Sequence, residues 1–360
     1  MNTRITRSAQ LRGLAIAGAT AIAMWTMSSA VAQPAPNCPK MDVVKVQEYT
    51  GYIVNLTTWV ASDQGILKKW CIEPQMISIP SAPAAFAASV QGGVDFIMSS
   101  VDTTFIPASQ GIDVKIVGAI NNTIFYAMVV GKHLKLTQEQ LQYPGVIKLL
   151  EGKQLGVNAF GAAMDGFARY TVKAASADPT QYKWVAYGAF PNGVAGLTNG
   201  TIDAIETSGD AMDIAAAATG GTIVADFRDP EVLKKLPQVA AITGANMMWV
   251  SPTAFVNKNP DVVRRFVAAQ NETIAFIRDP KNFDAIVKVV TAKAPSPESV
   301  PDPKALTVDR VKRYIVQLDP KASRKSMEAW NQLVVAEKRM PKPVDIDALI
   351  WEGARGMLIP

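Results

Sequence analysis

The sequence predicts an α/β protein of two lobes, each a mixed or parallel sheet flanked by helices. One observation is a segment that recurs 108 residues later, as VDFIMSSVD at 94–102 and IDAIETSGD at 202–210. Each copy follows an apolar run and a glycine turn, and reads as a strand ending in hydroxyls and an aspartate, residues that begin helices. Chance is the alternative, because helix, glycine, strand and serine follow one another in many α/β proteins.

The second observation is the alternation of short strand-like runs with helical runs, which favours a sheet with helices on its faces. Open sheets of this kind bind ligands outside the carboxyl ends of their strands, so function is expected in the crevice between the lobes. In the first lobe, strands are expected at 43–48, 76–79, 94–98 and 114–120, and helical segments at 53–61, 65–70 and 84–90.

The second lobe is expected to begin with a strand at 153–157, followed by a helix at 166–175, a strand at 183–187 and the second copy of the repeat. After residue 246 come a strand at 247–250, an amphipathic helix at 260–277 that starts with proline and aspartate, and a proline-rich connector at 294–303. The chain is therefore predicted to cross between lobes twice. The predicted division is a signal peptide (1–32), lobe one (33–122 and 247–360, with the C-terminal helices) and lobe two (123–246).

The N-terminus has the pattern of a secretory signal. Arg4, Arg7 and Arg12 precede an apolar stretch, and Ala30 and Ala32 supply a cleavage pattern, so the mature chain is expected to begin at Gln33. An uncleaved membrane anchor is the alternative. Without the three arginines the net charge falls from +5 to +2, and this balance gives no electrostatic reason to expect binding to nucleic acid or membranes.

The two cysteines are expected to form a disulfide. Cys38 precedes the first strand and Cys71 follows the next helix and turn, and exported proteins form disulfides in their oxidising compartment. A lipid anchor on Cys38 is the weaker alternative, because the residues before it do not form an apolar lipobox. One histidine, His133, and two bonded cysteines cannot supply a usual zinc site, so neither a metal nor another cofactor is expected. His133 is interpreted as a solvated turn residue.

Several segments together resemble the type II periplasmic substrate-binding proteins of ABC importers, in the branch that binds nitrate, taurine, alkanesulfonates and the pyrimidine precursor of thiamine. The resemblance covers almost the whole mature length. It rests on the order and spacing of ASDQGILKKW (61–70), QGGVDF (91–96), GIDVKIV (111–117), EGKQLGV (151–157), ADP (177–179), LTNGTIDA (197–204) and KNPDVV (258–263).

The resemblance implies capture of a small solute by lobe closure and delivery to an ABC permease in the inner membrane, by a periplasmic monomer. The alternatives are an accessory protein for a sensor kinase and a periplasmic enzyme on the same fold. An enzyme is not expected, because the sequence shows neither a nucleophile–base pair nor a hydrolase or zinc motif. The sequence leans slightly toward a small, partly planar or zwitterionic ligand, with sulfonate-like and pyrimidine-like solutes both open.

The candidate ligand-binding residues lie at the ends of the predicted strands. No arginine lies in these loops, so an anion would have to bind at helix N-termini, best at the loop that begins with Asn158. An acidic pair facing the crevice would instead favour a cationic group. The candidates are Tyr49, Thr50, Tyr52, Ser81, Ser99, Ser100, Asp102, Asn158, Phe160, Gly161, Ala162, Tyr187, Glu206, Thr207, Asp210 and Trp249.

Overall fold

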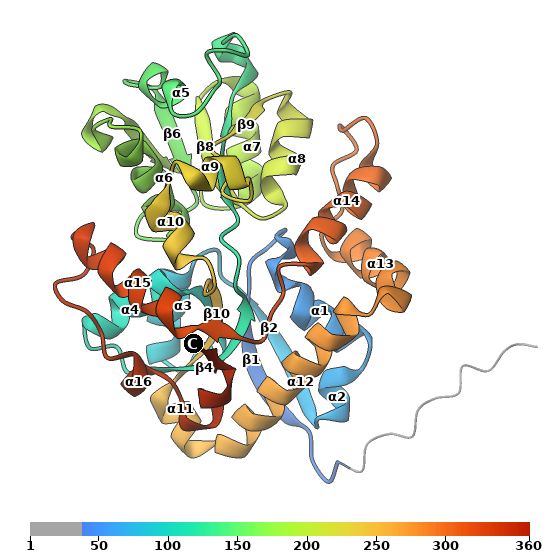
Figure 1. Cartoon of the computed structure of the whole chain (residues 1–360). Coiled ribbons are helices and arrows are strands. Elements are labelled where there is room, and N and C mark those ends of the chain that lie inside the picture. Colours follow the sequence, from blue (N-terminus) through green and yellow to red (C-terminus); the bar gives the residue numbers. More distant parts are fainter. Residues whose placement is uncertain (1–37) are drawn as a thin grey trace, which may run out of the picture. The chain divides into compact units, whose positions relative to one another are not determined.

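The computed structural model describes residues 38–360. The predicted signal peptide and its cleavage site lie outside the described residues. Two groups of strands, each covered by helices, form the two lobes of this part of the chain (Figure 1).

Lobe one is built on two short sheets that share an edge. Strand β1 (Asp42–Glu48) pairs in parallel with β2 (Ile72–Ser78), and β10 (Met247–Pro252) lies antiparallel between β3 (Ile97–Ser100) and β4 (Val114–Asn121). A parallel bridge between Val46 and Phe96 joins the two sheets. The helices before residue 110 are α1 (Leu56–Asp63), α2 (Ile66–Lys69), α3 (Ala82–Val90) and α4 (Val101–Ser109).

Lobe two is a five-stranded sheet in the order β7 (Lys183–Ala186), β6 (Gln154–Val157), β8 (Ala204–Ser208), β5 (Tyr126–Val130) and β9 (Thr222–Val224). Its strands β6, β7 and β8 are parallel, and β5 is antiparallel to both neighbours. The helices of this lobe are α5 (Gly145–Leu149), α6 (Ala163–Ala174), α7 (Phe190–Asn199), α8 (Ala211–Thr219), α9 (Pro230–Lys234) and α10 (Pro237–Ile242).

The C-terminal part of the chain is mainly helical. In Figure 1, α14 lies to the right and α15 to the left of the chain segments that connect the two lobes. The elements are α11 (Thr253–Lys258), α12 (Pro260–Arg278), α13 (Phe283–Lys293), α14 (Pro303–Ile315), α15 (Arg324–Ala336) and α16 (Ile346–Leu349), with a two-residue pairing of β11 (Ala322–Ser323) and β12 (Leu358–Ile359). Five short 3₁₀ helices complete the described part of the chain, at Ile53–Asn55, Lys132–Leu134, Pro179–Gln181, Pro280–Asn282 and Glu352–Met357.

The predicted α/β class with mixed, helix-flanked sheets is confirmed. The sheets are less parallel than the alternation suggested, because β5 and β10 each follow a passage from the other lobe and enter their sheet in the opposite direction. The second strand also starts earlier than predicted, at Ile72, and the third starts later, at Ile97. The lobe boundaries at 123 and 246 stay a prediction, which the membership of the sheets supports.

The predicted disulfide is present between Cys38 and Cys71, with Cα atoms 5.6 Å apart. It ties the start of the described chain to the turn before β2. Among residues 38–360, no helix combines the length and apolar character needed to cross a membrane.

Candidate functional site

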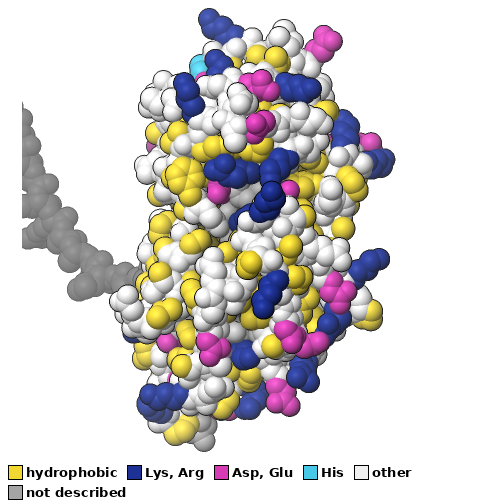
Figure 2. Space-filling model, turned by 90° about the vertical axis from the view of Figure 1, so that its left-hand side faces the viewer, with side chains coloured by type: hydrophobic (Ala, Val, Ile, Leu, Met, Phe, Trp, Pro, Cys, Tyr) yellow, Lys and Arg dark blue, Asp and Glu magenta, His cyan; other side chains and the backbone are white. Residues whose placement is uncertain are grey.

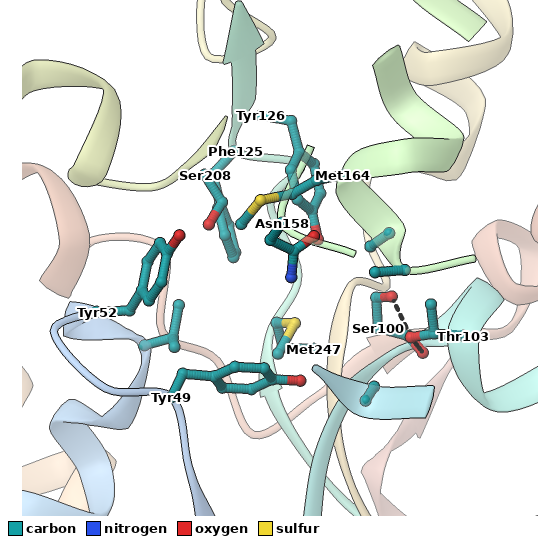
Figure 3. A pocket seen from close by; sticks show the side chains of 14 residues that line it. Tyr49, Tyr52, Ser100, Thr103, Phe125, Tyr126, Asn158, Met164, Ser208 and Met247 are labelled. Atoms are coloured by element: carbon teal, nitrogen blue, oxygen red, sulfur yellow. Dashed lines mark hydrogen bonds between the residues drawn. The ribbon is translucent and has the colours of Figure 1, made fainter. Parts of the chain in front are cut away.

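A cavity lies where strand ends and helix starts of both lobes meet (Figure 3). About 50 Å³ of this space is open to the centre of a water-sized molecule. The lining consists of aromatic, small and neutral polar side chains and contains no charged residue: Tyr49, Tyr52, Val54, Ala82, Ser100, Thr103, Phe125, Tyr126, Asn158, Ala162, Ala163, Met164, Ser208 and Met247.

The repeat found in the sequence places one serine from each lobe on the cavity wall. Ser100 ends β3 and Ser208 ends β8. Each is paired with the first residue of the antiparallel strand that has just entered its sheet, Met247 beside Ser100 and Tyr126 beside Ser208. All four residues line the cavity. The two copies of the repeat therefore place their serines at corresponding positions in the cavity wall.

Aromatic rings form much of the wall. The Tyr49 hydroxyl donates to the carbonyl oxygen of Met98 at 2.7 Å, which fixes its ring. Tyr126 is stacked between neighbours, with ring centroids 5.2 Å from Phe125 and 4.2 Å from Phe167. Tyr52 is only 6% exposed, and its hydroxyl has no hydrogen-bond partner within the described residues. Burial raises the Tyr52 pKa well above its ordinary value of 10.0, so this hydroxyl stays a hydrogen-bond donor.

Three helices begin at the cavity, so their N-termini supply backbone donors. Ala82 starts α3, Thr103 lies in the first turn of α4, and Ala163 and Met164 start α6. The backbone N–H groups of these four residues donate no hydrogen bond within residues 38–360. First-turn N–H groups have no partner inside their own helix, and the helix dipole adds positive potential there.

Asn158 provides a second sign that the cavity takes a polar ligand. It is 6% exposed and points into the cavity in Figure 3. Its amide nitrogen makes one long bond, 3.4 Å to the carbonyl oxygen of Pro80, and its amide oxygen has no partner among the described residues. A buried side-chain amide costs free energy unless its hydrogen bonds are made, so a ligand group is the natural partner here.

The aspartates near the cavity do not face it as free carboxylates, because each is paired with an arginine. Asp102 contacts Arg339 (Oδ2 to Nη1, 2.8 Å), and Asp210 contacts Arg310 (Oδ2 to Nε, 2.7 Å). A third pair, Asp165 with Arg169, holds the first turn of α6. The predicted cleft loops indeed hold no arginine, since Arg310 and Arg339 come from the C-terminal helical region.

Glu206 is the one carboxylate of this region without a partner in the described structure. It lies on β8, two residues before Ser208, is 1% exposed and accepts no hydrogen bond on either carboxylate oxygen. Burial, with a smaller contribution from the charge of Asp226, raises its pKa well above the ordinary 4.5. The neutral acid is therefore favoured, and the expectation of an acidic pair facing the crevice does not match the structure.

Five of the predicted contact residues line the cavity: Tyr49, Tyr52, Ser100, Asn158 and Ala162. Four others neighbour lining residues, three of them buried and Gly161 exposed. Ser99 bonds to the Thr103 hydroxyl, Tyr187 donates to the Glu206 carbonyl oxygen, Thr207 is buried, and Gly161 donates to Asp165.

Other predicted residues have structural roles or face away. Ser81 caps α3, Trp249 packs edge-on against Phe266 in the core, Thr50 is exposed beside Ser78, and Phe160 is 54% exposed. With Asp102, Glu206 and Asp210 described above, these complete the predicted set, whose role in binding stays a prediction.

The sequence reasoning missed nine lining residues: Val54, Ala82, Thr103, Phe125, Tyr126, Ala163, Met164, Ser208 and Met247. Ser208 could have been found, since it matches Ser100 in the repeat. Met247 lies at the entry of β10 into its sheet. Phe125 and Tyr126 stand where the chain enters lobe two, a strand that the sequence did not reveal.

His133 lies outside this cavity lining. Its Nε2 atom is 3.0 Å from Asp203 Oδ1, and its side chain is 31% exposed, so the turn interpretation needs the addition of a hydrogen-bond partner. Within residues 38–360, no group of three or more His, Cys, Asp and Glu side chains could hold a metal ion.

Comparison with known proteins adds a family and a fold. The model of the family described as NMT1/THI5 like matches residues 58–282, more than half of the chain. A search of curated proteins found no match to this sequence.

Solved structures of similar fold include a protein from Bordetella bronchiseptica RB50, with a TM-score of 0.72 and 18% identity over 88% of this chain and 96% of that one. The alkanesulfonate-binding protein SsuA from Xanthomonas axonopodis pv. citri, bound to MOPS, has a TM-score of 0.66 and 13% identity over 87% and 99%. The periplasmic nitrate-binding protein NrtA from Synechocystis PCC 6803 has a TM-score of 0.63 and 11% identity over 89% and 87%. At these identities the likeness shows the periplasmic binding protein fold.

Proposed function

Because the chain belongs to the NMT1/THI5 like family, we propose that it is an exported solute-binding protein of an ABC importer. It captures a small planar organic molecule that carries an acidic group, closes its two lobes on it, and delivers it to a permease in the inner membrane. The observation that carries this proposal is the cavity between the lobes, which combines aromatic walls with unused helix N-terminal donors.

The aromatic walls support a planar ligand body. Tyr49, Tyr52, Phe125 and Tyr126 all line the cavity. Such rings bind a flat apolar group through a large contact area and prefer offset or edge-to-face contact with other rings. A purely aliphatic solute could not make these ring–ring contacts.

The backbone donors support an acidic group on that body. The free N–H groups at Ala82, Thr103, Ala163 and Met164 belong to three different helices, and together they form an anion-binding wall without any basic side chain in the lining. SsuA and NrtA, which share the fold, are described as binding alkanesulfonate and nitrate, both of them anions. The ring of an aromatic carboxylate or sulfonate can contact the aromatic side chains, and its acidic group can accept hydrogen bonds from the helix N-termini.

A periplasmic enzyme on the same fold is the first alternative. General acid–base catalysis needs a titrating group within reach of the substrate. In the described structure the aspartates beside the cavity are ion-paired and Glu206 is buried behind the wall, which favours binding over catalysis. The second alternative, delivery of the closed form to a sensor kinase, uses the same cavity and differs only in the partner.

The test is a thermal-shift screen of the chain from Gln33 onward, refolded from denaturant to remove any co-purified solute. The panel contains aromatic carboxylates, alkanesulfonates, taurine, nitrate, thiamine and its pyrimidine precursor. A ligand at 100 times its Kd adds about 2.7 kcal/mol, enough to raise the melting temperature by a few degrees. A shift with aromatic acids supports the proposal, and the absence of a shift with every class would overturn it.

Two variants on one helix tie any shift to this cavity. Ala163→Leu fills space in the lining at the start of α6, whereas Ala174→Leu adds the same atoms at the exposed end of that helix. The first variant should abolish the shift and the second should keep it. Recovery of the ligand unchanged after incubation, checked by mass spectrometry, separates binding from catalysis.

A further inference from the structure

Arg339 lies outside the cavity but is linked to its wall. It follows α15, and its guanidinium Nη1 donates to Asp102 Oδ2 at 2.8 Å, while Nη2 lies 3.4 Å from the carbonyl oxygen of Gly161 in lobe two. The Asp102 side chain is 1% exposed and that of Arg339 is 22% exposed. Lys and Arg side chains gather at mid-height on the face shown in Figure 2, the side of the molecule that carries α6 and α15.

Asp102 is hydrogen-bonded to a residue that lines the cavity. The Ser100 hydroxyl, which lines the wall, donates to Asp102 Oδ1 at 2.5 Å, and a bond of 2.7 Å joins the Ser100 and Thr103 hydroxyls. An unpaired carboxylate at this place would repel an anion at the start of α4, because charges interact strongly through a medium of low dielectric constant. Arg339 supplies the compensating charge.

We infer that Arg339 is a positioning residue that makes the cavity selective for acidic ligands, by neutralising Asp102 behind the N-terminus of α4. This inference rests on the proposed function, because it concerns the same anion-binding wall. The buried amide oxygen of Asn158 in the same cavity has no hydrogen-bond partner among the described residues, which points independently to a polar ligand group there.

A glycine on α6 leaves room for this arginine. A Cβ atom on Gly166 would lie 2.1 Å from Arg339 Nη1 and 2.7 Å from its Cζ. The guanidinium therefore packs directly against the backbone of α6 and also lines a second, small hollow between α6 and α15. Because α6 belongs to lobe two and Asp102 to lobe one, this contact is made only when the lobes are together.

The experiment compares benzoate with benzamide, two probes of nearly the same shape that differ in charge, by isothermal titration calorimetry. The proteins are the wild type, Arg339→Met, Asp102→Asn and the double variant. The wild type should bind benzoate more tightly than benzamide. Arg339→Met should weaken benzoate binding about tenfold or more and benzamide binding less than about threefold. The double variant should recover the preference for benzoate, since no uncompensated charge remains, and Asp102→Asn alone should keep it.

Gly166→Ala provides a second route that alters no charge. The added methyl group displaces the guanidinium from Asp102, so the preference for benzoate should fall as in Arg339→Met, even if the latter variant folds poorly. If Arg339→Met and Gly166→Ala keep the wild-type preference, or if the double variant fails to recover it, the inference is wrong and the proposed function stands. If the wild type binds neither probe, or both equally, the acidic-ligand part of the proposed function fails and the inference fails with it.

Discussion

The two copies of the repeat have the same design but different surroundings. In lobe one, Ser100 lines the cavity and Asp102 pairs with Arg339; in lobe two, Ser208 lines the cavity and Asp210 pairs with Arg310. In both cases the arginine comes from the C-terminal helical region, more than 90 residues after its aspartate.

The difference lies in how deeply each arginine is buried. Arg310 is 0% exposed and also donates to Ala294 and Ser296, each at 3.0 Å, so it fixes α14 to the start of α8. Arg339 is 22% exposed and lies outside the cavity lining. The same sequence pattern thus forms a buried structural ion pair in lobe two. In lobe one it forms an ion pair that neutralises an aspartate behind the cavity wall. The burial of the arginine makes this difference.

The largest effect is expected from Arg310→Met. The substitution leaves the buried Asp210 carboxylate without its partner, and breaking a buried ion pair from one side costs about 3–5 kcal/mol. We expect the free energy of unfolding, measured by urea denaturation, to fall by that amount. Arg339→Met should cost less, because Arg339 is 22% exposed, whereas both partners of the Asp210–Arg310 pair are buried.

Adding Asp210→Asn to Arg310→Met is the matched control. It removes the uncompensated charge, so much of the lost stability should return. Equal losses for Arg310→Met and Arg339→Met would show that the two copies do not differ in the way that their burial indicates.

A second contrast concerns Glu206, whose place in the first copy is taken by the apolar Met98. The raised pKa of Glu206 means that the folded protein keeps a proton that the unfolded chain releases above about pH 4.5. Stability from this group is full below that pH and is lost as pH rises toward the raised pKa. The loss amounts to about 1.4 kcal/mol per pH unit in that window.

Glu206→Gln removes this titration. The difference in free energy of unfolding between the variant and the wild type should therefore grow in favour of the variant as pH rises from about 5. Denaturation curves at a series of pH values measure it. Parallel pH profiles for the two proteins would mean that Glu206 is not buried as a neutral acid. Glu206→Met, which installs the residue of the first copy, should behave like Glu206→Gln.

Local signals in the sequence were sufficient for the fold class and most elements of regular structure. The strands β3 and β8 are buried along their whole length, and α12 starts at the predicted Pro260. The direction of β5 and β10 was not accessible in this way, because it depends on where the chain returns from the other lobe. No local pattern encodes that path.

The site was predicted only in part, for a similar reason. Strand ends with hydroxyls identified Ser100 and the region of Ser208, since they share a short-range pattern. The ionic partners of Asp102 and Asp210 could not be found, because Arg310 and Arg339 are distant in sequence and no motif marks either of them. Burial of Glu206 is likewise a tertiary property, as a strand residue of this type is exposed or buried according to what packs over it.

The smallest effect separates the two serines. The Ser100 hydroxyl donates to a carboxylate, and removing a hydrogen bond to a charged group costs about 1.5–3 kcal/mol, so Ser100→Ala should lower the free energy of unfolding by that amount. Ser208 lines the cavity and its hydroxyl makes no side-chain hydrogen bond within residues 38–360. Ser208→Ala should therefore change stability by less than about 0.5 kcal/mol. It should still weaken binding of an aromatic acid two- to tenfold, approximately, by removing one ligand contact. A stability loss as large as that of Ser100→Ala would place Ser208 in the scaffold, and the crevice would then be contacted through the repeat from lobe one alone.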